Sequence, residues 1–277
     1  MLPAKGRRRI FSAAVVGLTL LGALLVILPS ATYAIPCNST ITTNTTLTAG
    51  LTCHAIQGLT IGANNIVLNC NHKTIAGMVG NALYGIEVSG YTGVTIENCV
   101  IKEFGTGIEL LNGADGNYLI NDYVTKSGGD NVLIQDSSGN TLIEVRAESS
   151  SGGNGVDLES ATSNTFTSNI VNGNHLDGYS LDSASTGNSF VEDEASMNLQ
   201  NGFSVAGGSN TFIDNTATAN HAYGYYDTTT GAAVYPSYGT ANSYEADAYQ
   251  GDLSGGSSPV CAPVLAYYCQ TTSPGYW

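Results

Sequence analysis

The chain has 277 residues, of which 8 are Lys or Arg and 22 are Asp or Glu, so its formal net charge is −14. Such an acidic chain repels phosphate backbones, which argues against nucleic acid as a partner. It contains 34 glycines and lacks long runs of helix-forming residues, which favours an all-β, turn-dense fold over a helical one.

Residues 1–34 have the pattern of a secretory signal. Basic residues from Lys5 to Arg9 precede an apolar run from Ile10 to Leu28, and small residues before Ala34 offer a cleavage site. The apolar run is also near the length of a membrane span, so an uncleaved anchor is the alternative. We therefore expect a secreted or cell-surface protein that meets the membrane only through this segment, if the segment is retained.

A short repeat organises the middle of the chain. Beyond a Thr-rich stretch at 35–57, apolar residues alternate from Leu59, and the register becomes regular from Tyr84. An Asn followed by Thr, Ser or Tyr and then by a large apolar residue recurs at intervals of 23, 24, 24 and 22 residues. These asparagines are Asn117, Asn140, Asn164, Asn188 and Asn210. A fixed period of this length is a signature of a repeat architecture.

A second pattern runs in phase with the asparagines and marks where each period begins. Each start opens a short run in which apolar and polar residues alternate, and the starts are Gly85, Gly107, Asn131, Gly155, Gly178, Gly202 and Gly224. A third apolar run, with Val124, Ala147 and Val171, keeps the same phase. One period cannot bury three such short runs alone, whereas stacked periods bury them in one continuous column.

This pattern predicts parallel stacking of short strands, one period per coil. With strands ~4.8 Å apart, eight to nine coils give a rod of roughly 40 Å. A β-sandwich would need longer strands and would have no reason to keep a strict period. The asparagine row is best interpreted as structural, because Asn suits tight turns and stacked amides can hydrogen-bond from coil to coil. A ligand-binding row is the alternative.

The pattern loosens after Gly224, and residues 250–277 are rich in Gly, Ser and Pro. We expect this tail to cap the open end of the column, where unpaired strand edges invite aggregation. The predicted organisation is a signal peptide or anchor at 1–34, a β-helix at 35–249 and a C-terminal cap or tail at 250–277.

Six cysteines follow the signal segment: Cys37, Cys53, Cys70, Cys99, Cys261 and Cys269. An even number of cysteines in an exported chain predicts disulfides. Cys37 with Cys53 would pin the N-terminal cap, and Cys261 with Cys269 would close a short C-terminal loop. Cys70 and Cys99 lie about one coil apart, so they could meet on neighbouring coils. The sequence does not choose among the possible pairings.

The candidate functional residues are acids that interrupt the repeat. On the first strand of each coil, the residue between two inward apolar positions points outward, and this row reads Glu87, Glu109, Leu133, Asp157, Ser180 and Ser204. The next outward row contains Glu159 and Asp182. Stacked carboxylates are unfavourable unless one is protonated or a cation intervenes. The candidate acid–base residues are therefore Glu87, Glu109, Asp157, Glu159 and Asp182, and the last three are candidate Ca²⁺ ligands.

The alternative for these acids is a solvated surface, because exposed charges interact weakly. No other cofactor is expected. The spacing of Cys and His residues does not match a zinc or copper site.

The Asn-Thr-Leu/Phe signature and the stretch from Leu68 to Ile75 resemble the right-handed parallel β-helix proteins of the pectate-lyase-like superfamily. The resemblance covers residues 40–250 and is strongest to the branch with short parallel-β-helix repeats, which includes the NosD-like periplasmic proteins. It implies an all-β, single-stranded right-handed parallel β-helix with a disulfide-pinned N-terminal cap and an irregular C-terminal cap.

The resemblance says less about activity, because the superfamily includes lyases, hydrolases, epimerases and non-enzymes. The Asp-Pro-His stretch of alginate epimerases and the paired aspartates of polygalacturonases are missing, so no catalytic residue of the family carries over. Related enzymes use Arg or Lys on acidic sugars. Here Arg146 is the one arginine after residue 34, and between Glu144 and Glu148 it is expected to form surface ion pairs.

Two classes of function follow. The first is a protein that binds polysaccharide or cell-envelope glycan, or builds the envelope, without catalysis. Its exposed tyrosines would stack on sugars, and the candidates are Tyr223, Tyr225, Tyr226, Tyr244 and Tyr249. The second is a polysaccharide lyase, glycoside hydrolase or epimerase that works through the outward acids. A NosD-like accessory role in metal-centre maturation is a third reading. The sequence favours the first class.

Overall fold

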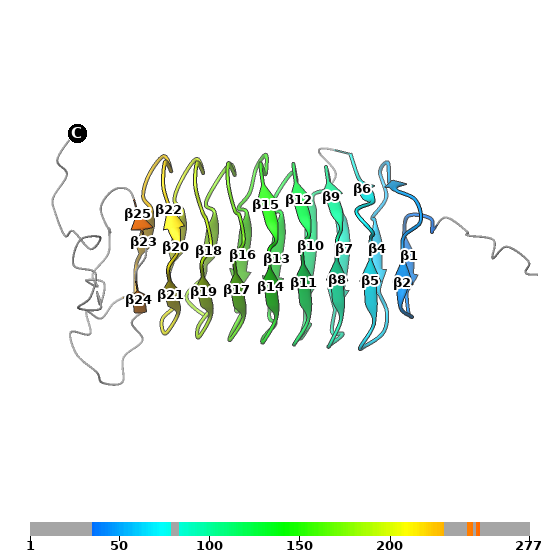
Figure 1. The fold of residues 1–277 in the computed structure, drawn as a ribbon, viewed down its shortest axis with the longest axis horizontal. Coiled ribbons are helices and arrows are strands. Elements are labelled where there is room, and N and C mark those ends of the chain that lie inside the picture. Colours follow the sequence, from blue (N-terminus) through cyan, green and yellow to red (C-terminus); the bar gives the residue numbers. More distant parts are fainter. Residues whose placement is uncertain (1–34, 79–82, 230–242, 246–247, 250–277) are drawn as a thin grey trace, which may run out of the picture. The chain divides into compact units, whose positions relative to one another are not determined.

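The computed structural model describes residues 35–78, 83–229, 243–245 and 248–249. These residues form a solenoid of short parallel strands without any helix in the described part. Successive coils lie side by side in chain order, starting from β1 (Figure 1). The predicted parallel β-helix is confirmed, with about eight coils where eight to nine were expected.

Each described coil contributes a strand to sheet A and a strand to sheet B, and the first five coils also contribute a strand to a third sheet, sheet C. Sheet A contains β1 (Ser39–Ile41), β4 (Leu59–Ile61), β7 (Tyr84–Ser89), β10 (Thr106–Leu111), β13 (Val132–Gln135), β16 (Val156–Glu159), β18 (Tyr179–Leu181), β20 (Phe203–Val205) and β23 (Tyr225–Asp227). Sheet B contains β2 (Thr45–Thr46), β5 (Val67–Asn69), β8 (Thr95–Glu97), β11 (Tyr118–Ile120), β14 (Thr141–Ile143), β17 (Thr165–Thr167), β19 (Ser189–Val191), β21 (Thr211–Ile213) and β24 (Ser243–Glu245).

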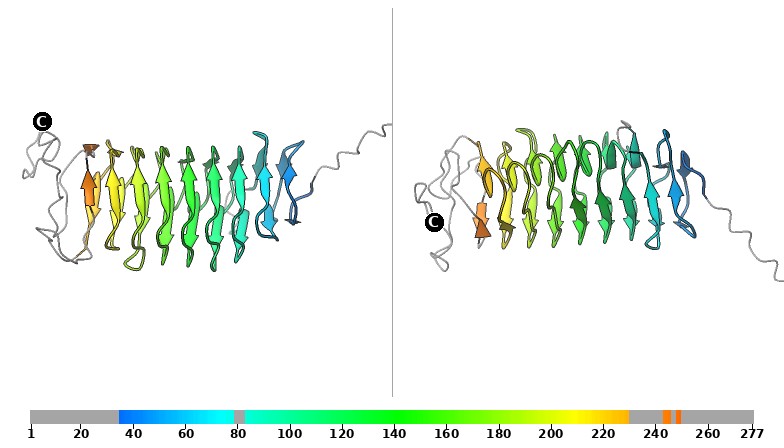
Figure 2. Two further views of the ribbon diagram at one scale, coloured as in Figure 1. Left: turned by 60° about the horizontal axis from the view of Figure 1, so that its bottom comes forward. Right: turned by 90° about the horizontal axis from the view of Figure 1, so that it is seen from above.

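The third sheet is shorter and less regular. Sheet C contains β3 (Leu51–Thr52), β6 (Thr74–Ala76), β9 (Val100–Lys102), β12 (Tyr123–Thr125) and β15 (Arg146–Glu148). Beyond β15 it continues as single bridges through Ile170 and Glu194, and then as the pair β22 (Thr216–Ala217) and β25 (Ala248–Tyr249). Two further views show the coils stacked in the same chain order from other sides (Figure 2).

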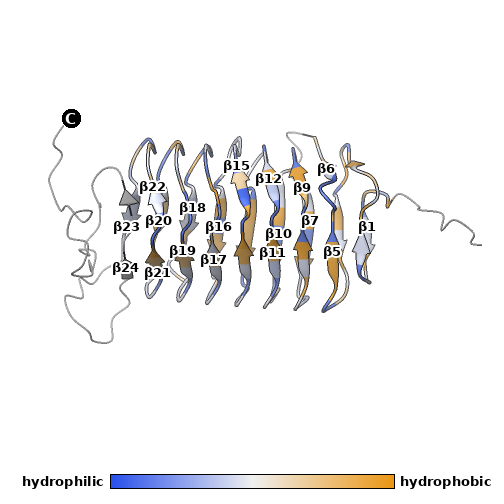
Figure 3. Cartoon of the chain, viewed as in Figure 1, coloured by the Kyte–Doolittle hydropathy of each residue, from blue (hydrophilic) through white to orange (hydrophobic). Residues whose placement is uncertain are grey.

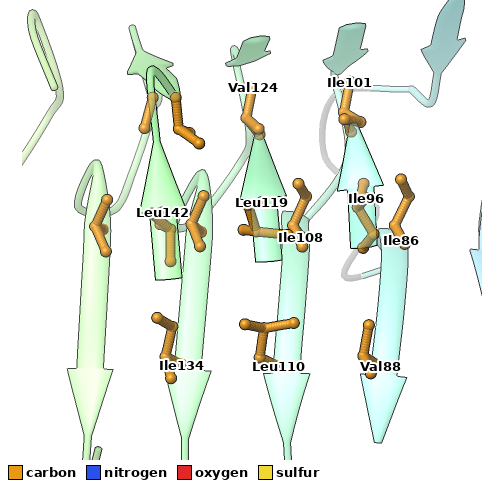
Figure 4. Close-up of a cluster of buried hydrophobic side chains, with 14 of the residues drawn as sticks. Ile86, Val88, Ile96, Ile101, Ile108, Leu110, Leu119, Val124, Ile134 and Leu142 are labelled. Carbon is orange, nitrogen blue, oxygen red and sulfur yellow. The ribbon is translucent and has the colours of Figure 1, made fainter. Parts of the chain in front are cut away.

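The core is a column of apolar side chains inside the coils. Strands carry alternating hydrophobic and hydrophilic residues (Figure 3), and the hydrophobic ones point inward. Ile86 and Val88 from β7 face Ile96 from β8 and Ile101 from β9, and the next coils repeat the arrangement (Figure 4). All four of these side chains are at most 1% exposed. The predicted inward phase is therefore confirmed.

Aromatic residues replace aliphatic ones in the core of the later coils. On sheet B, the ring of Phe190 stacks on Phe166 at 4.6 Å and on Phe212 at 4.8 Å. On sheet A, Phe203 stacks on Tyr179 at 4.8 Å and on Tyr225 at 4.7 Å. These distances match the ~4.8 Å spacing of strands, so aromatic rings at equivalent positions stack without strain.

Asparagine ladders lie at all three corners of the coil. In the row recognised from the sequence, each amide oxygen accepts the backbone N–H of the preceding coil, as Asn164 does from Asn140 at 2.8 Å. A second ladder runs through Asn169, Asp193 and Asn215, and a third runs through Asn174, Asn198 and Asn220. Buried backbone donors at the corners are thereby satisfied, which supports the structural interpretation.

Most coils start with a glycine, and at Gly107 and Gly155 neighbouring side chains leave no space for a Cβ atom. A Cβ atom built on Gly155 would collide with the side chain of Val171, and one on Gly107 would collide with Val124. The chain must pass close to the third apolar run at this corner, so only glycine or a rearranged corner fits.

Two disulfides join the first coils. Cys37 bonds Cys53, and Cys70 bonds Cys99 across neighbouring coils. The first pair pins the N-terminal end as expected, and the second confirms the suggested proximity. Cys261 and Cys269 lie outside the described residues.

Candidate functional site

The predicted outward row exists and runs along sheet A. Strand register aligns the row across seven coils, from β7 to β23. We call it the sheet A row, and its members are Glu87, Glu109, Leu133, Asp157, Ser180, Ser204 and Tyr226. Tyr226 extends the row beyond the residues expected from the sequence.

Glu87 and Glu109 are direct neighbours on β7 and β10. Partial burial raises the pKa of Glu109, and the negative charge of Glu87 raises it further, whereas a hydrogen bond with Thr106 lowers it. The predicted contact between like charges is therefore present. It makes Glu109 a weaker acid than an exposed glutamate.

Asp157 is the most perturbed carboxyl of the row. Burial raises its pKa to about 7, and the charges of Asp130, Glu159 and Asp182 add to the effect, while a hydrogen bond with Ser180 opposes it. A carboxyl with a pKa near neutrality can both donate and accept a proton at neutral pH. Leu133 separates Asp157 from Glu109, so the two acids lie two strand spacings, ~10 Å, apart along the row.

The other two predicted acids have local hydrogen-bond partners. Glu159 accepts a hydrogen bond from the side-chain amide of Gln135 at 2.7 Å. Strand β18 ends at Leu181, and Asp182 turns into the following corner. There its Oδ1 accepts hydrogen bonds from the backbone N–H groups of Ser160 and Ala184 at 3.1 Å and from the hydroxyl of Ser185 at 2.7 Å.

These contacts bear on the calcium expectation. Within the described ranges, no group of three or more His, Cys, Asp or Glu side chains is arranged to hold a metal ion. Asp182 already uses one oxygen on its own corner. Calcium at Asp157, Glu159 and Asp182 stays a prediction that the geometry of these residues does not strengthen.

A further acid-containing row borders the site and was not identified as functional from the sequence. Asp130 accepts the backbone N–H of Asn154 at 2.6 Å, and Asp177 accepts that of Asn201 at 2.8 Å. Burial raises the pKa of both aspartates. The available signal was their place in the repeat, because Asp130 and Asp177 each directly precede the residue that starts a coil, Asn131 and Gly178. Asp130 matters most because its charge acts on Asp157.

Tyrosines form a platform at one end of the sheet A row. The rings of Tyr223 and Tyr226 lie 5.8 Å apart with an interplanar angle of 19°, and Tyr226 is 37% exposed. Tyr225, expected to be exposed, is instead 1% exposed, because alternation along β23 turns it into the core against Phe203. The side chains of Tyr244 and Tyr249 lie outside the described residues.

Positive charge lies elsewhere in the described coils. Strands of sheet A carry no Lys or Arg in the described part of the chain, whereas Lys102 and Arg146 belong to sheet C. Arg146 binds Glu148 at 2.8 Å and lies over the ring of Tyr123, which confirms the expected surface ion pair. The sheet A row therefore presents acids, hydroxyls and a tyrosine platform without a cationic neighbour on its own sheet.

The chain belongs to the family described as the right handed beta helix region, whose model matches residues 49–237. Together with the fold, this confirms the resemblance to right-handed parallel β-helix proteins. No curated protein matches the chain. Within the described ranges, no helix is long and apolar enough to cross a membrane.

Three solved structures show the same fold at low identity. A variant of the periplasmic alginate epimerase AlgG is 16% identical with a TM-score of 0.51, over 77% of this chain and 57% of that one. A double variant of AlgG is 12% identical with a TM-score of 0.54, over 80% and 68% of the two chains. The Dettilon tailspike protein is 12% identical with a TM-score of 0.54, over 72% and 43%. The chain thus spans little more than half of the first epimerase structure.

Proposed function

We propose that this protein binds polysaccharide or cell-envelope glycan along the sheet A row, outside the cytoplasm. The observation that carries the proposal is the stacked pair of Tyr223 and Tyr226 at the end of a row of acids and hydroxyls. Tyrosine rings pack against the apolar faces of sugars, while carboxylates and serine hydroxyls accept or donate hydrogen bonds to sugar hydroxyls.

The length of the row suits a chain-like ligand. From Glu109 to Tyr226 the row crosses five strand spacings, ~24 Å. A sugar polymer lying across the strands would meet equivalent outward positions in successive coils. The carboxylates of the sheet A row repel negative charge, so they favour a neutral or cationic glycan over an anionic one.

The test is glycan binding by the purified chain and by two tyrosine variants. After a glycan array identifies a ligand, calorimetry should show about tenfold weaker binding for Tyr226→Ala, which corresponds to ~1.4 kcal/mol. Tyr118→Ala is the matched control, because Tyr118 is also exposed, at 45%, but lies on sheet B. Equal losses in both variants, or no glycan bound by the parent chain, would rule out the proposal.

A second candidate function is hydrolysis of the bound glycan by Asp157 and Glu109. It is favoured by one observation, the pKa of Asp157 at about 7, which suits a general acid. Inverting glycosidases keep their two carboxyl groups ~6.5–9.5 Å apart, and flexible side chains two strands apart can reach that range. If the bound glycan contains acidic sugars, the same two acids would instead carry out lyase or epimerase chemistry.

The catalytic candidate is tested by product assays. Release of reducing ends should depend on pH near neutrality and fall at least 100-fold in Asp157→Asn. Asp214→Asn should retain full activity, because Asp214 is exposed at the corner that follows β21 on sheet B. Unsaturated products would indicate lyase chemistry instead. Activity that survives in Asp157→Asn would remove this carboxyl as the catalyst, and a parent chain without activity on its bound glycan leaves binding as the function.

The compartment is part of the same proposal. Two disulfides in the first coils are compatible with an oxidising environment such as a periplasm or the cell exterior. The test is thiol labelling of the protein in its own cells, before and after reduction. Labelling of Cys70 and Cys99 without reduction would place the chain in a reducing compartment and contradict the proposal.

A further inference from the structure

The outward face of sheet B differs in chemistry from that of sheet A. Over four coils, its first outward row is Thr141, Thr165, Ser189 and Thr211. Its second outward row is Ile143, Thr167, Val191 and Ile213. We call these eight side chains the sheet B face. All of them are partly exposed, and register aligns them strand by strand.

The sheet B face carries only hydroxyl and methyl groups. It has no charged side chain, although the chain as a whole has a formal net charge of −14. Seven of its eight members are β-branched, and such side chains have few rotamers on a strand. These side chains would therefore lose little conformational entropy when a partner binds.

The core behind the face fixes its spacing. Directly inside, Phe190 stacks on Phe166 at 4.6 Å and on Phe212 at 4.8 Å, with interplanar angles of 5° in both cases. Along a strand, the two outward rows are two residues, ~6.6 Å, apart. The hydroxyl and methyl groups therefore form a rigid two-dimensional lattice. It repeats every ~4.8 Å from coil to coil and every ~6.6 Å along each strand.

The dimensions of the face argue against a protein partner. Four strands of three residues cover roughly 200 Å². A stable interface buries about 800 Å² on each partner, so a second copy of this chain docked here would gain too little. Glycan is also a poor fit, because the outward positions of the four strands of the face carry no aromatic ring and no carboxylate.

We propose that the sheet B face binds ice. An ice surface is an uncharged lattice of hydrogen-bond donors and acceptors that repeats every few ångströms, as this face does. Threonine and serine hydroxyls can take positions of lattice water, and the methyl groups of Ile, Val and Thr can lie between them. Each contact is weak, but a rigid array makes many at once without losing side-chain entropy.

The experiment measures how the purified full chain partitions into slowly growing ice, together with its inhibition of ice recrystallisation. The parent chain should be enriched in the ice fraction. Thr167→Tyr places a bulky ring in the middle of the lattice and should reduce this enrichment at least tenfold. Thr74→Tyr is the matched control, because Thr74 is a partly exposed outward threonine on sheet C, and it should behave as the parent.

Several results would overturn the proposal. They are exclusion of the parent chain from ice, equal effects of Thr167→Tyr and Thr74→Tyr, or co-sedimentation with insoluble chitin or cellulose that only Thr167→Tyr abolishes. A dimer that Thr167→Tyr dissociates would assign the face to a second copy instead. Circular dichroism checks folding, and Ile143→Lys supplies a second disruption at a different coil if Thr167→Tyr does not fold.

Discussion

At the scale of single residues, Asp122 is a buried carboxyl in the second corner ladder, at a position where two later coils have the amides of Asn169 and Asn215. It is 1% exposed, its Oδ1 accepts the backbone N–H of Cys99 at 2.8 Å, and its Oδ2 has no partner. Burial raises its pKa well above the usual range. In the same ladder, Asn169 donates to the carbonyl of Leu142 and Asn215 donates to that of Phe190.

Asp122→Asn should therefore stabilise the protein at neutral pH. The amide keeps the oxygen that Cys99 needs and removes the cost of ionising a buried carboxyl, so we expect a gain of about 1–3 kcal/mol at pH 7. The folded pKa is raised, so the stability contributed by Asp122 is complete below pH 4 and is lost as pH rises through the folded pKa.

The measurement is urea unfolding of the parent and of Asp122→Asn at pH 4 and pH 7. The advantage of the variant should shrink at pH 4, where the carboxyl of the folded parent is protonated and that of the unfolded parent, with an ordinary pKa of about 3.9, is about half protonated. Asp136→Asn, at an exposed turn position, is the control and should change stability by less than ~0.5 kcal/mol at either pH. An advantage of equal size at both pH values would contradict the argument.

Residue identity also explains what could be predicted from the sequence. The first asparagine ladder was predictable because every coil from Asn117 to Asn210 repeats the same amino acid. The second ladder was missed, since Asp122, Val145 and Asp193 interrupt its asparagines and no single letter recurs. At Asp157 the outward position was predictable from alternation, but its raised pKa comes first from burial and then from the charge of Asp130, which belongs to a different part of the coil.

At the scale of elements, a corner ladder should contribute more to stability than any exposed strand residue. Asn188 accepts hydrogen bonds from the backbone N–H of Asn164 at 2.9 Å and from its amide at 3.1 Å, and it donates to the carbonyl of Ala161 at 2.9 Å. It is 1% exposed, so water cannot replace these contacts.

Asn188→Ala should destabilise the protein by at least ~2 kcal/mol, because it leaves more than one buried backbone group without a partner. Thermal unfolding followed by circular dichroism measures the loss. Asn64→Ala is the matched control: Asn64 also accepts a backbone N–H, that of Thr92 at 2.9 Å, but at an exposed position where water can substitute. Similar losses in the two variants would show that burial does not set the contribution of these corners.

Strand positions were predictable to within a residue or two because apolar alternation is strict. The departures have local causes. Strand β18 ends one residue before Asp182, since that side chain accepts hydrogen bonds from its own corner. Tyr225 was assigned to the wrong face, since a run of tyrosines gives no apolar–polar contrast from which alternation can be read. Which tyrosine faces outward is set by pairing of Phe203 with Tyr225.

At the scale of the whole molecule, the disulfides should act on one end only. Cys70 and Cys99 are 29 residues apart and join neighbouring coils. In a solenoid each coil contacts only its neighbours, so a lost crosslink is felt locally. The double variant Cys70→Ser and Cys99→Ser should lose roughly 3 kcal/mol, as expected for a loop of this size.

Hydrogen exchange resolves where that loss occurs. Amide protection should fall in strands β4 to β9 and stay unchanged in β19 and β21, which lie several coils away. The variant Cys37→Ser and Cys53→Ser provides the comparison, with effects limited to the first two coils. A uniform loss of protection along the solenoid would mean that it unfolds as one unit and that nearest-neighbour coupling does not describe it.

The repeated corner geometry has a consequence for how such a chain can change in length. Gly139 and Ser163 both adopt left-handed backbone conformations, with φ of 65° and 57°, and each precedes a ladder asparagine. Excising residues 140–163 would join Gly139 to Asn164 and recreate the same corner, one coil shorter. Duplication or loss of one whole coil would therefore change the length of the solenoid along its axis by ~4.8 Å, and every remaining corner would keep its hydrogen bonds.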